Sequence, residues 1–134
     1  MSTTTVITQG FIRPVGLRVL PAANQVIVAQ RNGQLFAVDL TTAQSTQVGA
    51  VSGRVNAFDV TPDGQIAYVS GNSLGVWEVS LNGGENRRLV RGLAQPMGVT
   101  LDSEGMLLVA EGRAPGRLIS INPNPVEAVL RHAG

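Results

Sequence analysis

The sequence predicts an all-β protein of three four-stranded antiparallel sheets, arranged like the blades of a β-propeller. Short alternating apolar stretches separated by turn residues indicate strands rather than helices. One strand–turn pattern also occurs three times, and its equivalent residues Gly16, Ala57 and Gly98 lie 41 residues apart. A repeat near 40 residues with four strands per unit is typical of a propeller blade.

The middle repeat shows each element of the unit most clearly. Residues 55–60 read as a strand in which Asn56, Phe58 and Val60 point to one face and Ala57 and Asp59 to the other. A Pro-Asp-Gly turn separates them from residues 66–69, an almost continuous apolar run that suits a strand covered on both faces. Residues 77–81 alternate again, and a glycine-rich hairpin signal leads to a fourth strand near residues 88–90.

The repeats follow one another without a linker, so we expect a single domain. Residues 3–8 are rich in β-branched side chains and precede a stretch that matches Gly92 to Pro96, so they predict an outer strand. At the other end the repeat predicts an outer strand at residues 128–131, whereas Asn124-Pro125 is a possible start for a short helix. The expected sections are an N-terminal outer strand at 1–12 and blades at 13–50, 51–92 and 93–134.

The composition excludes several classes of function. The chain has no Cys, which excludes disulfides and thiol catalysis. Its net charge is +1, and its ten basic residues are all Arg, without the dense basic face and aromatic residues of a nucleic-acid binder. No apolar run approaches the ~20 residues of a membrane-spanning helix, and the first residues lack a signal-peptide pattern. We therefore expect neither a nucleic-acid nor a membrane partner, and a cytoplasmic location.

Three stretches of the chain resemble a known family. They are RPVGLRVLPAANQVIVAQRNGQLFAVDL, RVNAFDVTPDGQIAYVSGNSLGVWEVSL and QPMGVTLDSEGMLLVAEGRAPGRLISINP. All three are similar to blades of six-bladed propellers of the NHL and SMP-30/gluconolactonase types, and the resemblance covers nearly the whole chain. It implies the propeller fold, and it implies little about function because such blades serve many functions.

The starts of the inner strands are the expected ligand-binding positions. They are Val15, Asn56 and Met97, which we expect at the mouth of the central channel. The resemblance implies that an SMP-30-like enzyme holds a divalent cation there with carboxylates and an Asn, the oxygen ligands that Ca²⁺, Mg²⁺ and Mn²⁺ prefer. Asn56 matches that Asn, but Met97 stands where the family has an Asp. We therefore expect no cofactor and no metal, with Asn56 as the one remaining ligand if the family site survives.

Charged residues occupy two further places of interest. Arg18, Asp59 and Thr100 are equivalent in the three repeats, on inner strands whose faces should be covered by neighbouring blades. Because an unpaired buried charge is costly, we expect Arg18 and Asp59 to form a buried ion pair. Glu111 and Arg113 follow the second strand of the third repeat, where we expect a solvated turn.

Catalysis has little support in the sequence. The only His, His132, lies near the C-terminus, where chains fray, whereas a Ser-His-Asp triad needs its His fixed in a cleft. We therefore expect a non-catalytic binding or scaffolding module with an unidentified small-molecule or protein ligand. Two alternatives stay open: an SMP-30/lactonase-like metal-dependent small-molecule hydrolase, and a half-propeller fragment without its own activity.

Assembly is part of the prediction, because three blades cannot close a six-bladed ring. The flanks of such a half would expose apolar strands near residues 26–28 and 107–109, and soluble monomers seldom expose large apolar patches. A homodimer with a two-fold axis along the ring would cover both flanks. In that dimer residues 3–8 would complete the third blade of the partner, in competition with residues 128–131 of the partner itself.

Overall fold

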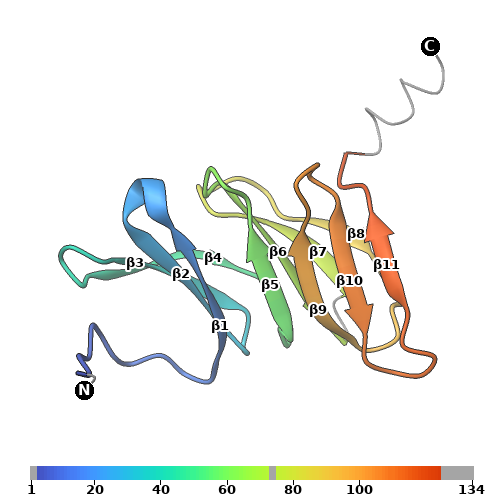
Figure 1. Cartoon of the computed structure of the whole chain (residues 1–134), viewed down its shortest axis with the longest axis horizontal. Helices are drawn as coiled ribbons and strands as arrows, with labels where there is room; N and C mark the ends of the chain where they lie inside the picture. Colours follow the sequence, from blue (N-terminus) through green and yellow to red (C-terminus); the bar gives the residue numbers. More distant parts are fainter. Residues whose placement is uncertain (1–2, 73–74, 125–134) are drawn as a thin grey trace, which may run out of the picture.

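The structure is a computed structural model that describes residues 3–72 and 75–124. In these residues eleven strands form three antiparallel sheets that follow one another along the chain (Figure 1). The prediction of an all-β chain made of propeller-like blades is confirmed. No helix in this described part is long and apolar enough to cross a membrane.

The first sheet is the first blade, with its strands in chain order from the inner to the outer edge. A single 3-10 turn, Pro21–Ala23, joins its first two strands and ends at Asn24, whose left-handed φ of 52° an Asn tolerates better than most residues. The strands are β1 (Pro14–Leu20), β2 (Gln25–Gln30), β3 (Gln34–Asp39) and β4 (Ser45–Ala50).

The second sheet repeats this order one blade further along. Its second strand is buried along almost its whole length, because a blade lies on each side of it. This agrees with the continuous apolar run at residues 66–69. The strands are β5 (Ala57–Val60), β6 (Ile66–Gly71), β7 (Gly75–Ser80) and β8 (Arg87–Val90).

The third sheet contains three strands in the described residues, in the order β9, β10, β11 from the inner edge outward. They are β9 (Pro96–Leu101), β10 (Leu107–Glu111) and β11 (Leu118–Ile121). The fourth strand expected at residues 128–131 and the alternative helix from Pro125 onward both lie outside the described residues.

The N-terminal segment corrects one expectation, since residues 3–12 form no strand. The first blade already has its four strands, with β4 in the outer position, and β-branched composition alone does not add a fifth strand beside β4. Instead the segment crosses the free face of this blade, where Phe11 packs edge-to-face on Phe36 with ring centroids 5.8 Å apart. Ile7 and Thr8 line an apolar groove of 320 Å³ on the same face.

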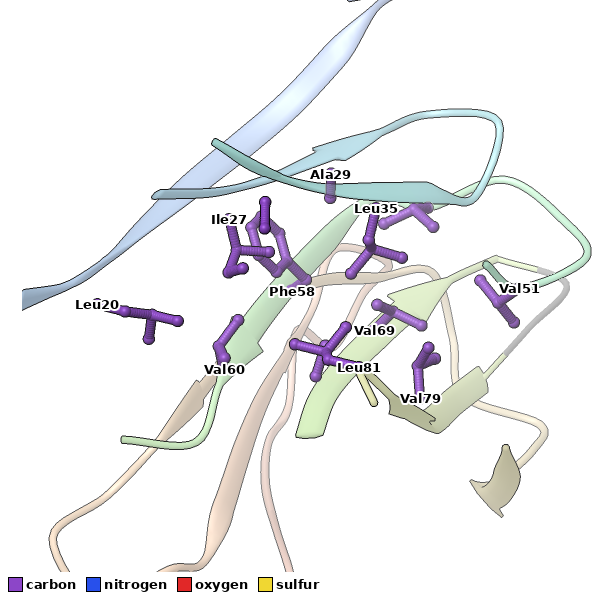
Figure 2. Packing of buried hydrophobic residues seen from close by; sticks show 13 residues of the cluster. Leu20, Ile27, Ala29, Leu35, Val51, Phe58, Val60, Val69, Val79 and Leu81 are labelled. Carbon is purple, nitrogen blue, oxygen red and sulfur yellow. The ribbon is translucent and has the colours of Figure 1, made fainter. Parts of the chain in front are cut away.

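The larger core lies between the first and second blades, and Phe58 is its largest fully buried side chain. Figure 2 shows Phe58 next to Ile27 of the first blade. The opposing position on the inner strand is Gly16, where a Cβ would lie 3.3 Å from Cε1 of Phe58, so a glycine leaves room for the ring. Leu35 and Val69 are fully buried in the same core.

A smaller core joins the second blade to the third. Tyr68 and Val76 of the second blade pack there against Val99, Leu107 and Val109 of the third. All five are buried. The second blade therefore presents one apolar face to the blade before it and one to the blade after it.

Candidate functional site

The two ends of the inner strands β1, β5 and β9 form two separate surfaces. The starts of the strands lie at one end, where Asn56 at the entry to β5 contacts Pro96, the first residue of β9. Their last residues lie at the other end, where Asp59 contacts Arg18 and Leu101. Sequence candidates fall at both ends.

At the start end, the three expected ligand positions have different environments. Val15 is half-buried and packs against the larger core, whereas Met97 is half-exposed. Asn56 is half-buried, and its Nδ2 donates to the carbonyl of Pro96 at 3.0 Å and to Oδ1 of Asn72 at 2.7 Å. Asn56 thus joins the second blade to the third, and no hydrogen bond of the described residues joins the side chains of the three candidates to one another.

Metal-ligating side chains do not gather at either end. Within residues 3–72 and 75–124, no three His, Cys, Asp or Glu side chains come together in a way that fits a metal ion.

Beside the start of β1 lies a pocket of 270 Å³ that the sequence did not reveal. Three arginines line it, Arg13, Arg31 and Arg54, together with Ile12 and Asn32. All three arginines are exposed, and the ion pairs of the described residues involve other arginines. The sequence could have signalled this site, because Arg13 and Arg54 are equivalent residues just before the inner strands of two successive repeats.

The backbone around this pocket is fixed by hydrogen bonds that recur in the third blade. Arg31 donates its N–H to the carbonyl of Arg13 at 2.9 Å, and Gly112 donates to the carbonyl of Gln95 at 2.7 Å. Arg13 and Gln95 also share a left-handed φ, of 47° and 57° respectively. The same connection into an inner strand is therefore built with arginines in the first blade and with neutral residues in the third.

A buried polar side chain supports each of these two connections. Gln30 at the end of β2 accepts the N–H of Ile12 at 2.9 Å, and Glu111 at the end of β10 accepts the N–H of Ala94 at 2.6 Å. Arg117 donates to both oxygens of Glu111, at 2.6 and 3.1 Å. The hydrogen bonds from Arg117 are the larger cause, and the one from the N–H of Ala94 the smaller cause, that hold the pKa of the Glu111 carboxyl below its ordinary value.

Glu111 therefore corrects the expectation of a solvated turn. It is the last residue of β10 and is buried, because the loop that follows returns and places Arg117 over it. Arg113, at the tip of that loop, is exposed as expected.

At the other end of the inner strands, Arg18 and Asp59 form an ion pair with Nε and Oδ1 3.2 Å apart. The expectation that the pair is buried is wrong, because the Arg18 side chain is 44% exposed and that of Asp59 15%. Both residues lie on edge strands of their sheets, so water reaches the pair. The Arg18 guanidinium also covers the Phe58 ring, 5.3 Å from its centroid.

Asp59 connects all three blades. Its Oδ2 accepts the N–H of Leu101 at 2.8 Å and the hydroxyl of Thr100 at 3.2 Å, both in the third blade, while Oδ1 meets Arg18 of the first. The equivalence of Arg18, Asp59 and Thr100 in sequence is thus an actual contact between neighbouring inner strands.

Asp59 also borders a cleft of 480 Å³ between the second and third blades. Tyr68 lies in its wall and donates its hydroxyl to Oε1 of Glu78 at 3.3 Å. Burial is the largest cause, followed by the charge of Glu78, that raises the pKa of Tyr68 to about 12. The Tyr68 side chain in this cleft is therefore a neutral phenol at physiological pH and not a general base.

Comparison with known proteins supports the fold and leaves the family open. No family model matches the sequence, and no curated protein matches it. The chain is similar in structure to the β-propeller domain of Cps50 (Swd1) from Myceliophteria thermophila, with a TM-score of 0.66 and 16% identity over 86% of this chain. It is also similar to hydrazine synthase from Kuenenia stuttgartiensis, with a TM-score of 0.69 and 21% identity over 93% of this chain.

The chain spans 37% of the length of each of these two structures. At such identities the likeness shows the fold alone, which is a set of β-propeller blades. The finer resemblance to NHL and SMP-30 propellers stays a prediction.

Proposed function

We propose that this chain is a non-catalytic binding module whose three blades complete a six-bladed propeller with a second copy of the chain. One observation supports ring closure: residues that are buried inside the chain have exposed equivalents at its two flanks. Leu17, Phe58 and Val99 are equivalent residues of the three inner strands, and they are 57%, 2% and 6% exposed. Phe58 and Val99 are covered by the preceding blade, whereas no blade among the described residues lies before Leu17.

The opposite flank repeats the pattern. Leu35, Val76 and Leu118 pair with equivalent residues of the second strand in their blades, so they too are equivalent. Leu35 and Val76 are fully buried by the blade that follows, whereas Leu118 is 74% exposed. The described residues thus leave one uncovered apolar flank of each type, and these are the two types of face that join the blades inside the chain.

Two such flanks on one chain are complementary to each other. In a dimer with a two-fold axis along the ring, the third blade of each copy meets the first blade of the other, which gives two identical junctions and no free flank. Leu118 of one copy then approaches Leu17 of the other, as Leu35 approaches Phe58 within the larger core. The N-terminal segment lies beside Leu17 but leaves more than half of it exposed, so it does not replace a blade.

In this proposal the ligand binds at the end of the molecule where the inner strands begin. Ring closure would bring six strand starts around one channel mouth, with Val15, Asn56 and Met97 contributed by each copy. Propellers use this kind of concave, loop-lined surface to bind small molecules or proteins. No cofactor is part of this proposal.

Light scattering on the purified full chain tests ring closure. We expect twice the chain mass of 14.0 kDa at micromolar concentration, and a buried area of roughly 2,000 Å² or more, as in obligate dimers. Leu17→Asp should shift the protein to the monomer, whereas Thr46→Asp, which adds the same charge on the exposed part of β4, should not. A compact monomer of the unaltered chain, or an open series of larger oligomers, would contradict the proposal.

A further inference from the structure

The pocket lined by Arg13, Arg31 and Arg54 concentrates positive charge that the fold does not use. The three arginines come from the entry to β1, the turn after β2 and the entry to β5. Within the described residues, no carboxylate forms an ion pair with any of them. The backbone brings them together, since Arg31 donates to the carbonyl of Arg13 and Val55 donates to the carbonyl of Arg31, both at 2.9 Å.

The repeat itself shows that the fold does not need arginine at these places. In the third blade Gln95 takes the place of Arg13, and Gly112 takes the place of Arg31. The equivalent backbone hydrogen bond and left-handed φ are kept there with these neutral residues. Holding three like charges around 270 Å³ opposes folding through their mutual repulsion, so an anionic ligand accounts for them better than the architecture does.

The chemistry of the pocket wall narrows the class of anion. Guanidinium groups are permanently charged and present their N–H donors as a planar fork, which matches the oxygens of a phosphate or a carboxylate. Three positive charges favour the phosphate, because a phosphomonoester carries about two negative charges at neutral pH and a carboxylate only one. The remaining polar side chain, Asn32, is already engaged, because its Oδ1 accepts from Gln30 and from the N–H of Gln34 and its Nδ2 donates to Gln34 Oε1 at 3.4 Å. The pocket is also compact and has no aromatic residue in its wall, unlike a surface on which nucleic-acid bases stack.

We propose that this pocket binds the phosphate group of a small phosphomonoester. The site lies within the first two blades of one chain, so it goes beyond the proposed ring closure and does not depend on it. It lies next to Val15 and Asn56 at the start end of the inner strands, so a ligand held by its phosphate would extend toward the channel mouth.

The test is an NMR titration of the ¹⁵N-labelled full chain with inorganic phosphate and, separately, with phenyl phosphate, at constant ionic strength. We expect saturable shifts of the backbone amides of Arg31, Asn32 and Arg54, with one site per chain. Arg31→Asn, which copies the equivalent Asn72 of the second blade, should weaken binding by about tenfold, the value of one charged hydrogen-bonding group. Arg113→Gln, which removes an exposed charge outside the pocket, should leave the affinity unchanged.

Several results would overturn this assignment. The first is the absence of saturable shifts, and the second is a folded Arg31→Asn variant that binds with unchanged affinity. The third is an equal loss of affinity in Arg113→Gln, which would indicate a diffuse charge effect. Tighter binding of a single-stranded RNA oligonucleotide, with shifts spread beyond the pocket, would replace the small ligand by nucleic acid. Light scattering on the same samples reports whether the chain is a dimer. A failure of phosphate binding can therefore be told apart from a failure of ring closure.

Discussion

The carboxylate of Asp59 in the second blade accepts the backbone N–H of Leu101 in the third blade at 2.8 Å. Its other oxygen meets the exposed Arg18 of the first blade. Asp59→Ala leaves the Leu101 N–H without its partner and should lower the free energy of unfolding by about 2–3 kcal/mol. Arg18→Gln should cost only about 1 kcal/mol or less, because an exposed ion pair and an exposed cation–π contact are weak. Urea unfolding at one fixed protein concentration measures both, and equal losses would contradict the connecting role of Asp59.

Phe58 and Leu17 allow a matched test of the core, since they occupy equivalent positions. Phe58→Ala leaves a cavity in the largest core and should destabilise the chain by about 3–5 kcal/mol. Leu17→Ala removes a side chain that no blade covers in the part of the chain that the structure describes. It should therefore hardly change the unfolding of the monomer and should weaken only the dimer. Urea unfolding across a range of protein concentrations separates the two effects. A large, concentration-independent loss for Leu17→Ala would show that its face is covered within one chain.

The Glu111 carboxyl should make the stability depend on acid pH. Its pKa in the folded chain lies below the ordinary 4.5, so its contribution is fully present above about that pH and is lost as the pH falls through the folded value. Glu111→Gln copies the equivalent Gln30, which accepts the same type of backbone N–H. This variant should be less stable at pH 7 and should lose less stability between pH 5 and pH 2 than the unaltered chain. Parallel acid-unfolding curves for the two proteins would be evidence against the Arg117 ion pair.

Tyr68 is the only tyrosine, so phenolate absorbance reports on it alone. Its pKa is raised from 10.0 to about 12 in the folded chain, first by burial and then by Glu78. The folded state therefore holds this proton more tightly, and the stability due to it is present below about pH 10 and declines as the pH rises toward 12. At pH 11 the native chain should show little phenolate absorbance, and adding urea should increase it sharply. Full ionisation of the Tyr68 phenol in the native chain at pH 11 would show instead that this side chain is exposed to solvent.

Much of the fold follows from the sequence because the repeat places equivalent residues in equivalent surroundings. The repeat predicted inner strands covered by neighbouring blades, as Phe58 is, and the apolar run at residues 66–69 predicted a strand covered on both sides. Residues 3–8 failed this reasoning, because β-branched composition describes the residues and not the presence of a free strand edge.

The candidate sites follow less well, because they depend on contacts between distant residues. Glu111 looked solvated, since nothing local shows that the loop returns to bring Arg117 onto it. The three arginines of the proposed phosphate pocket are far apart in sequence. Backbone hydrogen bonds within the first blade and between the first and second blades bring them together. The pairing of Arg18 with Asp59 could be foreseen from their equivalence, but their exposure depends on both being on edge strands.

The central claim is that the two free flanks of the chain meet each other across copies, and crosslinking tests it most directly. The chain has no cysteine, so Leu17→Cys and Leu118→Cys place the only thiols on the two flanks. A mixture of the two single variants, treated with a short bismaleimide, should give a crosslinked dimer, and the double variant should give a dimer linked at both junctions. A control pair, Leu17→Cys with Thr46→Cys, should stay uncrosslinked. Absence of the Leu17–Leu118 product in a folded sample at micromolar concentration would contradict ring closure by a second copy.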